Sequence, residues 1–181
     1  MKTIYGDITS IRELKREDEQ DVHRYASLEE TCRFQIWGPN TREETKAYID
    51  QVLADAASLE RSRYVFSIID RSTGLMVGAG EVIVKDRWNQ AGEVGDVVHP
   101  DFWGKGIATD AATLLIGFGF QELRLHRIAA TCHPENRGSS RVLEKVGMTF
   151  EGCIRDHLKL KNGWRDSLLY SVLEDDWRKG G

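Results

Sequence analysis

The most restrictive part of the chain is a short stretch in which an apolar segment, a proline, a glycine-spaced turn and a second apolar segment follow one another. Val97 and Val98 end the first apolar segment, and Pro100 stops it. Gly104 and Gly106 come just before a run rich in alanine, isoleucine and leucine. Glycines leave the backbone uncovered, so the unpaired amides of a helix's first turn can converge on an anion. The stretch therefore predicts a strand, an anion-binding turn and a buried helix, in that order.

The turn over residues 104–109 is predicted to bind phosphate. The positive end of the helix dipole and Lys105 both favour an anion there. The spacing fits neither a P-loop, G-x-x-x-x-G-K-[ST], nor a dinucleotide fingerprint, G-x-G-x-x-G. Here the glycine pair is followed by Ile107, Ala108 and Thr109. The ligand is therefore expected to carry phosphates, and the motif that binds them is neither a P-loop nor a dinucleotide fingerprint.

This turn resembles the acyl-coenzyme A loop of the GNAT acetyltransferase superfamily, Q/R-x-x-G-x-G/A. Gly106 and Ala108 occupy its small positions, and Trp103 stands where many members have glutamine or arginine. The form W-G-K-G-x-A-T is similar to that of the RimJ/RimL-like branch. Residues 136–148 resemble the branch's N-x-x-S-x-x-V-L-E-K-x-G-[FM] segment, and residues 163–173 resemble its closing strand. The chain is identified as a member of this branch, which acetylates protein N-termini and assorted small amines.

Length and charge exclude several classes of protein. The 181 residues fit one domain, predicted to span residues 1–181. Lysines and arginines number 25 against 29 aspartates and glutamates, a formal net charge of -4. A nucleic-acid-binding protein needs clustered basic surface, so no nucleic acid is expected as a partner. The longest apolar stretch, residues 114–120, is far below the roughly 20 residues of a membrane-spanning helix, so no membrane association is expected.

The cysteines point to a reducing compartment. Cys32, Cys132 and Cys153 are odd in number and too scattered for a C-x-x-C pair or a zinc ribbon. They are interpreted as reduced thiols, and no metal site is predicted. Residues 1–7 lack the apolar core of a signal peptide. A cytoplasmic protein is expected.

The order of elements predicts an α/β fold. A strand is expected over residues 8–14, a surface helix over 16–28, and a helix over 41–56 that begins with a capping box between Thr41 and Glu44. Further strands are expected over 64–70, 75–85, 93–99, 127–133, 148–159 and 164–173, and further helices over 105–122 and 136–146. The resemblance implies a GNAT-like mixed, mostly antiparallel central sheet with helices on both faces.

The resemblance implies direct transfer of an acetyl group from acetyl-CoA to an amine, without a covalent acyl-enzyme. The sequence agrees, because it contains no cysteine in an activating motif, no G-x-S-x-G elbow and no H-E-x-x-H helix. The protein must then position the thioester, accept a proton from the amine and return one to the departing thiolate.

The resemblance also assigns residues to the cofactor. The loop Gly104, Lys105, Gly106, Ile107, Ala108 and Thr109 would hold the phosphates. The backbone amide of Val98 would stabilise the oxyanion, and Val97 would line the pantetheine. Asn136 would hydrogen-bond the pantetheine, although asparagine is equally suited to cap the helix that follows.

Proton transfer is assigned to Ser139 and a carboxylate. Many relatives donate a proton from a tyrosine at the position of Leu143, which cannot donate, so Ser139 of N-x-x-S is the expected acid. Glu81 is the first candidate for the base and Asp96 the second, because strand alternation gives each of them apolar neighbours and desolvation raises a carboxyl pKa. Asp166 and Tyr170 match family positions near the acceptor, where structural hydrogen bonding is at least as good an interpretation.

The expected function is acetylation of the N-terminal α-amine of a protein or peptide. Two alternatives stay open: acetylation of a small amine such as a polyamine, amino acid or toxin, and a catalytically silent acyl-CoA-binding module. The acceptor depends on the segment Phe34-Gln35-Ile36-Trp37 and on the last hairpin. The protein is expected to be a monomer or a homodimer.

Overall fold

The computed structural model describes residues 1–160 and 163–180. The strands are β1 (Ile4–Tyr5), β2 (Thr9–Glu13), β3 (Arg63–Asp70), β4 (Met76–Asp86), β5 (Ala91–Val98), β6 (Arg127–Cys132), β7 (Thr149–Leu160) and β8 (Gly163–Leu173). The α-helices are α1 (Glu19–Ala26), α2 (Glu29–Cys32), α3 (Arg42–Ala57), α4 (Ile107–Gln121), α5 (Arg137–Lys145) and α6 (Glu174–Gly180). Two short 3₁₀ turns, η1 (Arg16–Asp18) and η2 (Pro100–Phe102), precede α1 and the glycine turn.

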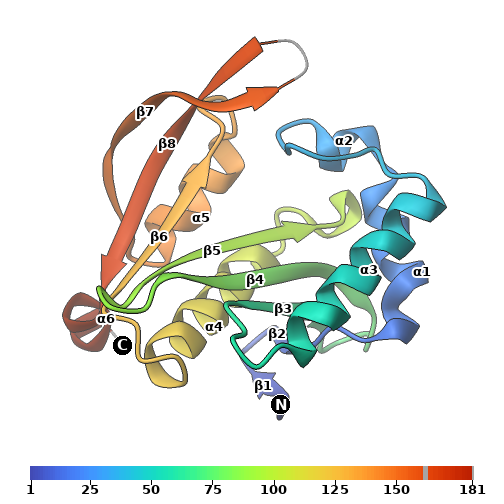
Figure 1. The fold of residues 1–181 in the computed structure, drawn as a ribbon, viewed down its shortest axis with the longest axis horizontal. Helices are drawn as coiled ribbons and strands as arrows, with labels where there is room; N and C mark the ends of the chain where they lie inside the picture. Colours follow the sequence, from blue (N-terminus) through green and yellow to red (C-terminus); the bar gives the residue numbers. More distant parts are fainter. Residues whose placement is uncertain (161–162, 181) are drawn as a thin grey trace.

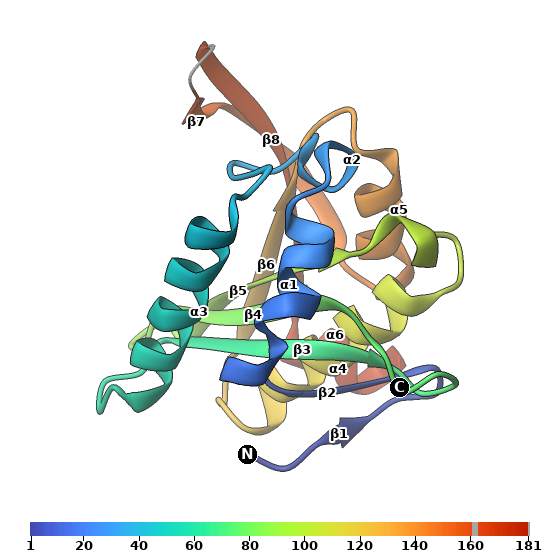
Figure 2. The same ribbon diagram turned by 90° about the vertical axis from the view of Figure 1, so that its right-hand side faces the viewer.

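The strands form one sheet in the order β1-β2-β3-β4-β5-β6-β8-β7 (Figure 1). Neighbouring strands are antiparallel except β5 and β6, which are parallel. Helices α1 and α3 cover one face, and α4 and α5 cover the other (Figure 2). The predicted mixed, mostly antiparallel sheet with helices on both faces is confirmed.

The parallel pair is the feature that positions the site. Strands β5 and β6 are paired only from Ala91–Arg127 to Glu93–Ala129, and then they diverge (Figure 1). The other edge of β5 stays paired with β4 up to Val98. In the described chain, residues 94–98 therefore have no strand partner on the β6 side. A wedge-shaped gap opens in the middle of the sheet.

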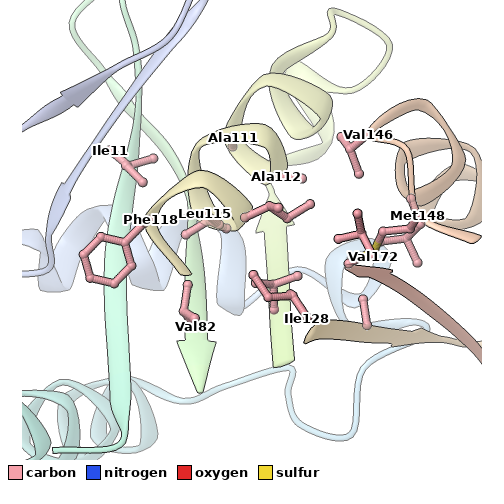
Figure 3. Packing of buried hydrophobic residues seen from close by; sticks show 14 of the residues in the cluster. Ile11, Val82, Ala111, Ala112, Leu115, Phe118, Ile128, Val146, Met148 and Val172 are labelled. Carbon is pink, nitrogen blue, oxygen red and sulfur yellow. The ribbon is translucent and has the colours of Figure 1, made fainter. Parts of the chain in front are cut away.

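Helix α4 packs into the larger core. Ala111, Leu115 and Ile116 of α4 are almost completely buried, as is Phe66 of β3. Figure 3 shows α4 side chains pointing among residues of several strands. Burying one large apolar side chain stabilises a fold by roughly 1.5–3 kcal/mol. The prediction of a buried helix after the glycine turn is confirmed, and a second core lies between α1, α3 and the opposite face of the sheet.

The N-terminal helix differs from the prediction. The segment predicted as one helix, residues 16–28, is divided into η1 and α1, and the short helix α2 that follows it was not predicted. The Asp18 carboxylate explains the first break, because it accepts hydrogen bonds from the Lys15 amide at 2.9 Å and from Arg12 at 2.6 and 2.7 Å. Strand β1 and helix α6 were not predicted. Helix α6 begins with three acidic residues and lacks a clear apolar period.

The capping box at the start of α3 is confirmed. The Glu44 amide donates to Thr41 Oγ1 at 3.2 Å, and the Thr41 amide donates to the Glu44 carboxylate at 2.8 Å. Among the described residues, no helix is long and apolar enough to cross a bilayer.

Candidate active site

The glycine turn presents a row of free backbone donors. Gly104 and Gly106 have φ angles of +74° and +81°, a conformation that favours glycine, and Gly106 is the N-cap of α4. In the described part of the chain, the amides of residues 104–109 donate to no protein acceptor, and the first helical bond runs from the Asp110 amide to the Gly106 carbonyl. Lys105 is exposed beside them. The turn has the geometry of an anion site.

An anchor holds this turn from one side. The Asp110 carboxylate accepts hydrogen bonds from the amides of residues 7–9 and from the Thr9 hydroxyl, the last two at 2.7 Å. Burial alone would raise the Asp110 pKa, but these hydrogen bonds lower it overall. The contact brings Ile8 beside Gly106, where an added Cβ would lie 3.0 Å from Ile8 Cδ1.

Gly106→Val is expected to weaken acetyl-CoA binding at least tenfold, about 1.4 kcal/mol. The branched side chain would cover the free amides and would force a non-glycine residue into a left-handed conformation. Isothermal titration calorimetry measures the dissociation constant.

Gly147→Val is the matched control, since Gly147 follows α5 with a φ of +80° and an added Cβ there meets nothing within 4 Å. Equal affinity in Gly106→Val and the wild type, or an equal loss in both variants, would contradict a phosphate site at the turn.

The end of β5 offers one more free donor. The His99 amide donates to the Val77 carbonyl. Because alternate residues of a strand bond to opposite sides, the amide and carbonyl of Val98 face the gap. The Trp103 indole donates to that carbonyl at 2.7 Å. The Val98 amide is left free along the gap.

Val97 and Val98 point their side chains to opposite faces of the sheet. Val98 is buried in the core beneath α4, whereas Val97 packs against the second core on the α1 and α3 side. Val98 therefore faces the gap with its backbone amide and carbonyl and not with its side chain. Val97 can contribute its half-buried side chain on the α1 and α3 face.

Asn136 caps α5. Its Oδ1 accepts the Ser139 amide at 3.1 Å. The side-chain NH₂ of Asn136 donates to no described residue, so it can still donate to a ligand. The capping interpretation is therefore correct, and it leaves room for a cofactor contact by the same side chain.

Ser139 lies in the first turn of α5, next to the end of β6. Its neighbour Ser140 is engaged, because its hydroxyl donates to the Asn136 carbonyl at 3.2 Å and lies 3.5 Å from Cys132 Sγ. Burial raises the pKa of the Cys132 thiol, and hydrogen bonds with Ser140 and Ser139 partly offset this. A thiol with a raised pKa is a poor nucleophile at neutral pH, which agrees with direct transfer. Leu143 is buried in the core.

The two candidate bases lie on opposite faces. Glu81 pairs in register with Gly95 and accepts a hydrogen bond from Arg63 Nε at 2.7 Å. Asp96 pairs in register with Gly80, on the face that packs against α4. Its side chain makes no hydrogen bond or ion pair with a described residue, and burial raises its pKa to about 7.

Residues 9–149, more than half of the chain, match the family model described as an acetyltransferase (GNAT) domain. The chain belongs to the GNAT acetyltransferase family. It is therefore an acetyl-CoA-dependent acetyltransferase, and the gap beside β5 together with the glycine turn is its candidate active site.

Several relatives match nearly the whole length of this chain. YnaD of Bacillus subtilis (strain 168), an uncharacterized N-acetyltransferase, is 35% identical over 92% of this chain and 94% of its own. The crystal structure of a GNAT-family acetyltransferase from Bacillus anthracis superposes with a TM-score of 0.81 at 30% identity and covers 96% of this chain and 99% of its own. Ribosomal-protein-S5-alanine acetyltransferase from Vibrio fischeri gives 0.79 at 25% identity, with 98% and 99% covered. The resemblance to the RimJ/RimL-like branch is confirmed.

The segment after α2, residues 33–40, contacts both walls of the gap beside β5. At one wall, its Asn40 amide donates to the Ala26 carbonyl of α1 at 2.9 Å, and α1 packs on β4. At the other wall, Arg165 Nη1 donates to the Phe34 carbonyl at 2.8 Å, and the rings of Phe34 and His133 lie 4.9 Å apart. The segment expected to influence the acceptor thus lies at the mouth of the gap.

Asp166 and Tyr170 are engaged elsewhere. Asp166 accepts the Asp156 amide at 2.8 Å, where β7 bulges against β8. Tyr170 is buried toward α5, with its hydroxyl 3.4 Å from Glu144 Oε1. Both residues therefore make hydrogen bonds within the protein, as the structural interpretation expects. Sequence reasoning did not single out Arg165. The two-residue period of β8 could have indicated it, because this period places Arg165 on the face opposite to Asp166 and Tyr170.

Proposed function

We propose that this enzyme acetylates the N-terminal α-amine of a protein or peptide. The observation that supports the acetyl-CoA side of the proposal is the line of free backbone donors from the glycine turn to the Val98 amide, along an unpaired strand edge. The activity named for the Vibrio fischeri relative, on an alanine of ribosomal protein S5, supports the choice of acceptor.

The donor would lie along the β5 edge. The amides of residues 104–109 and Lys105 would bind its phosphates, as expected at a helix N-terminus. The pantetheine arm would follow the gap, with the Asn136 side-chain NH₂ as a donor. The thioester oxygen would accept the Val98 amide, which would stabilise the charge that develops there.

In the transfer step, the amine nitrogen attacks the thioester carbon and a C–N bond forms. The tetrahedral intermediate collapses, the C–S bond breaks, and coenzyme A leaves as a thiolate. We assign Ser139 as the proton donor to that thiolate and a carboxylate as the acceptor of the amine proton, directly or through one water.

Asp96 is the better supported base. A base works best when its pKa is near the working pH, and the pKa of Asp96 is about 7. Glu81, the first candidate from sequence, is neutralised by Arg63 on the other face. We therefore assign the proton acceptor to Asp96, which would take the proton through one water because its side chain lies on the α4 face.

The expected acceptor is an α-amine and not a lysine side chain. An α-amine has a pKa of about 7.7–8.0, so roughly a tenth is neutral at pH 7, whereas for lysine at about 10.4 only about one molecule in 2,500 is. A site with one modest base serves the α-amine more readily. Because the lysine amine is the stronger nucleophile once neutral, we expect a net preference of about tenfold or more.

Mass spectrometry of competing peptides tests this preference. A peptide with a free N-terminus is mixed with an N-terminally blocked peptide that carries lysine, and a third arm contains spermidine. Acetate chiefly on the free N-terminus supports the proposal. Acetate chiefly on lysine or spermidine would favour a small-amine or side-chain acetyltransferase, and binding of acetyl-CoA without any transfer would indicate a silent module.

The proposed function also bears on the cellular compartment in which the enzyme acts. The ribosomal protein named as the substrate of the Vibrio fischeri relative supports action in the cytoplasm, and Cys32, Cys132 and Cys153 are free. The oligomeric state, monomer or homodimer, stays a prediction.

A further inference from the structure

Strand β8 carries two buried polar atoms without partners. The Ser167 side chain is fully buried at 0% exposure. Its Oγ and the Nε of Arg165 are buried, and neither makes a hydrogen bond to any described residue. An unsatisfied buried polar group destabilises a fold, because it loses its hydrogen bonds to water and gains none in return. Such atoms are uncommon in native proteins and require an explanation.

Both residues lie at the wall of the gap. Strand β6 ends at Cys132, which pairs with Leu168, so Ser167 and Arg165 lie beyond the end of β6. Because β5 and β6 are parallel, this is the end toward which the gap opens. Leu168 and Tyr170 belong to the core on the α4 and α5 face. Alternation therefore directs Arg165 and Ser167 to the opposite face, where the segment after α2 lies.

Arg165 is a cation without a counter-ion. No described carboxylate lies within ion-pair distance of it, whereas Arg12, Arg61, Arg63 and Arg127 each pair with an aspartate or glutamate. Burial lowers the pKa of Arg165, and an arginine still keeps its charge at neutral pH. A half-buried guanidinium repels a polycation and favours an acceptor that presents oxygen.

We propose that Arg165 and Ser167 bind the carbonyl oxygen next to the acceptor amine. Arg165 donates from Nε and Ser167 from its hydroxyl, which satisfies both buried atoms when the acceptor is bound. The substrate class is then an α-amino-acyl group, from a peptide N-terminus or a free amino acid. The inference rests on the proposed function and narrows it, since a polyamine offers no such oxygen.

The test compares two amines that differ in the carbonyl. Alaninamide carries it, and sec-butylamine is a close analogue without it. For each enzyme, kcat/KM is measured with both amines by thiol release, and the ratio of the two values is compared between variants. Because the amines are the same throughout, their different pKa values cancel from that comparison.

Arg165→Gln is expected to lower the ratio at least tenfold, and Ser167→Ala several-fold, with an unchanged acetyl-CoA dissociation constant. Arg155→Gln is the matched control, since Arg155 is exposed on β7 in the same hairpin, and it should leave the ratio unchanged. If Arg165 only holds the Phe34 carbonyl, both amines lose equally and the ratio stays constant, which would overturn the inference. Ser167→Ala keeps the test valid if Arg165→Gln does not fold.

Three further acceptors, an alanyl peptide, free alanine and spermidine, separate this inference from the proposed function. A wild-type enzyme that acetylates peptide N-termini, with variants that keep its ratio, contradicts only the carbonyl site. A preference for free alanine over an alanyl peptide supports the carbonyl site and contradicts the peptide acceptor. Transfer to spermidine with none to alaninamide, alanine or peptide would overturn both.

Discussion

At pH 8, Asp96→Asn is expected to lower kcat by about a hundredfold or more, the range for loss of a positioned base. Besides the limb of the acceptor amine at about 7.7–8.0, the wild-type kcat/KM should show a limb near 7, the pKa to which burial raises the Asp96 carboxyl. The variant should keep the amine limb and lack the limb near 7. Steady-state kinetics from pH 5.5 to 9 measures both effects.

The same substitution is expected to stabilise the fold above neutral pH. The folded pKa of about 7 exceeds the ordinary value of 3.8, so between these values the folded state binds the proton more tightly than the unfolded state. The free energy of unfolding of the wild type therefore falls as pH rises from about 4 to 7. Asp96→Asn removes this decline, a gain of about 2–4 kcal/mol at pH 8 that vanishes below about pH 4. Urea unfolding at pH 4 and pH 8 measures it.

Glu81→Gln is the comparison for the base. Glu81 is ion-paired with Arg63, so its loss should leave the limb near pH 7 in place. A limb that survives in Asp96→Asn and disappears in Glu81→Gln would reverse the assignment.

Ser139→Ala is expected to lower kcat by about a hundredfold, the low end for a positioned acid, with little change in acetyl-CoA affinity. The serine hydroxyl would no longer protonate the departing thiolate, while the amide of residue 139 still donates to the Asn136 cap. Steady-state kinetics and calorimetry separate turnover from binding.

Ser140→Ala is the matched control in the same helical turn. The Ser140 hydroxyl is bonded to the Asn136 carbonyl, so its removal should reduce stability by about 1 kcal/mol and leave kcat nearly unchanged. If Ser139→Ala keeps the wild-type kcat, or if both variants lose only stability, Ser139 is a structural residue.

Features that depend on local sequence were predictable. The glycine turn, the buried α4 and the Thr41 capping box each arise from residues within one or two helical turns of one another. The three-part resemblance gave the sheet class. These parts of the fold needed no knowledge of contacts between distant segments.

Features that depend on distant partners were not predictable. Asp110 acts through residues about a hundred positions earlier in the chain, and the division of the first helix depends on a carboxylate shared with β2. Glu81 and Asp96 looked alike in their strands, and they were distinguished by the ion pair of Glu81 with Arg63 and by the burial of Asp96. The unpartnered atoms of Arg165 and Ser167 could be recognised only once every neighbour was placed.

The unpaired edge of β5 places an aggregation hazard inside a working site. An open strand edge accepts any extended chain that comes within reach, and natural proteins normally shield such edges. Here the shielding comes from α4 beneath the sheet and from the segment after α2 at the mouth of the gap. The unpaired amides and carbonyls of β5 are therefore confined to a narrow gap. There they can bind an extended substrate arm instead of a strand from a neighbouring molecule.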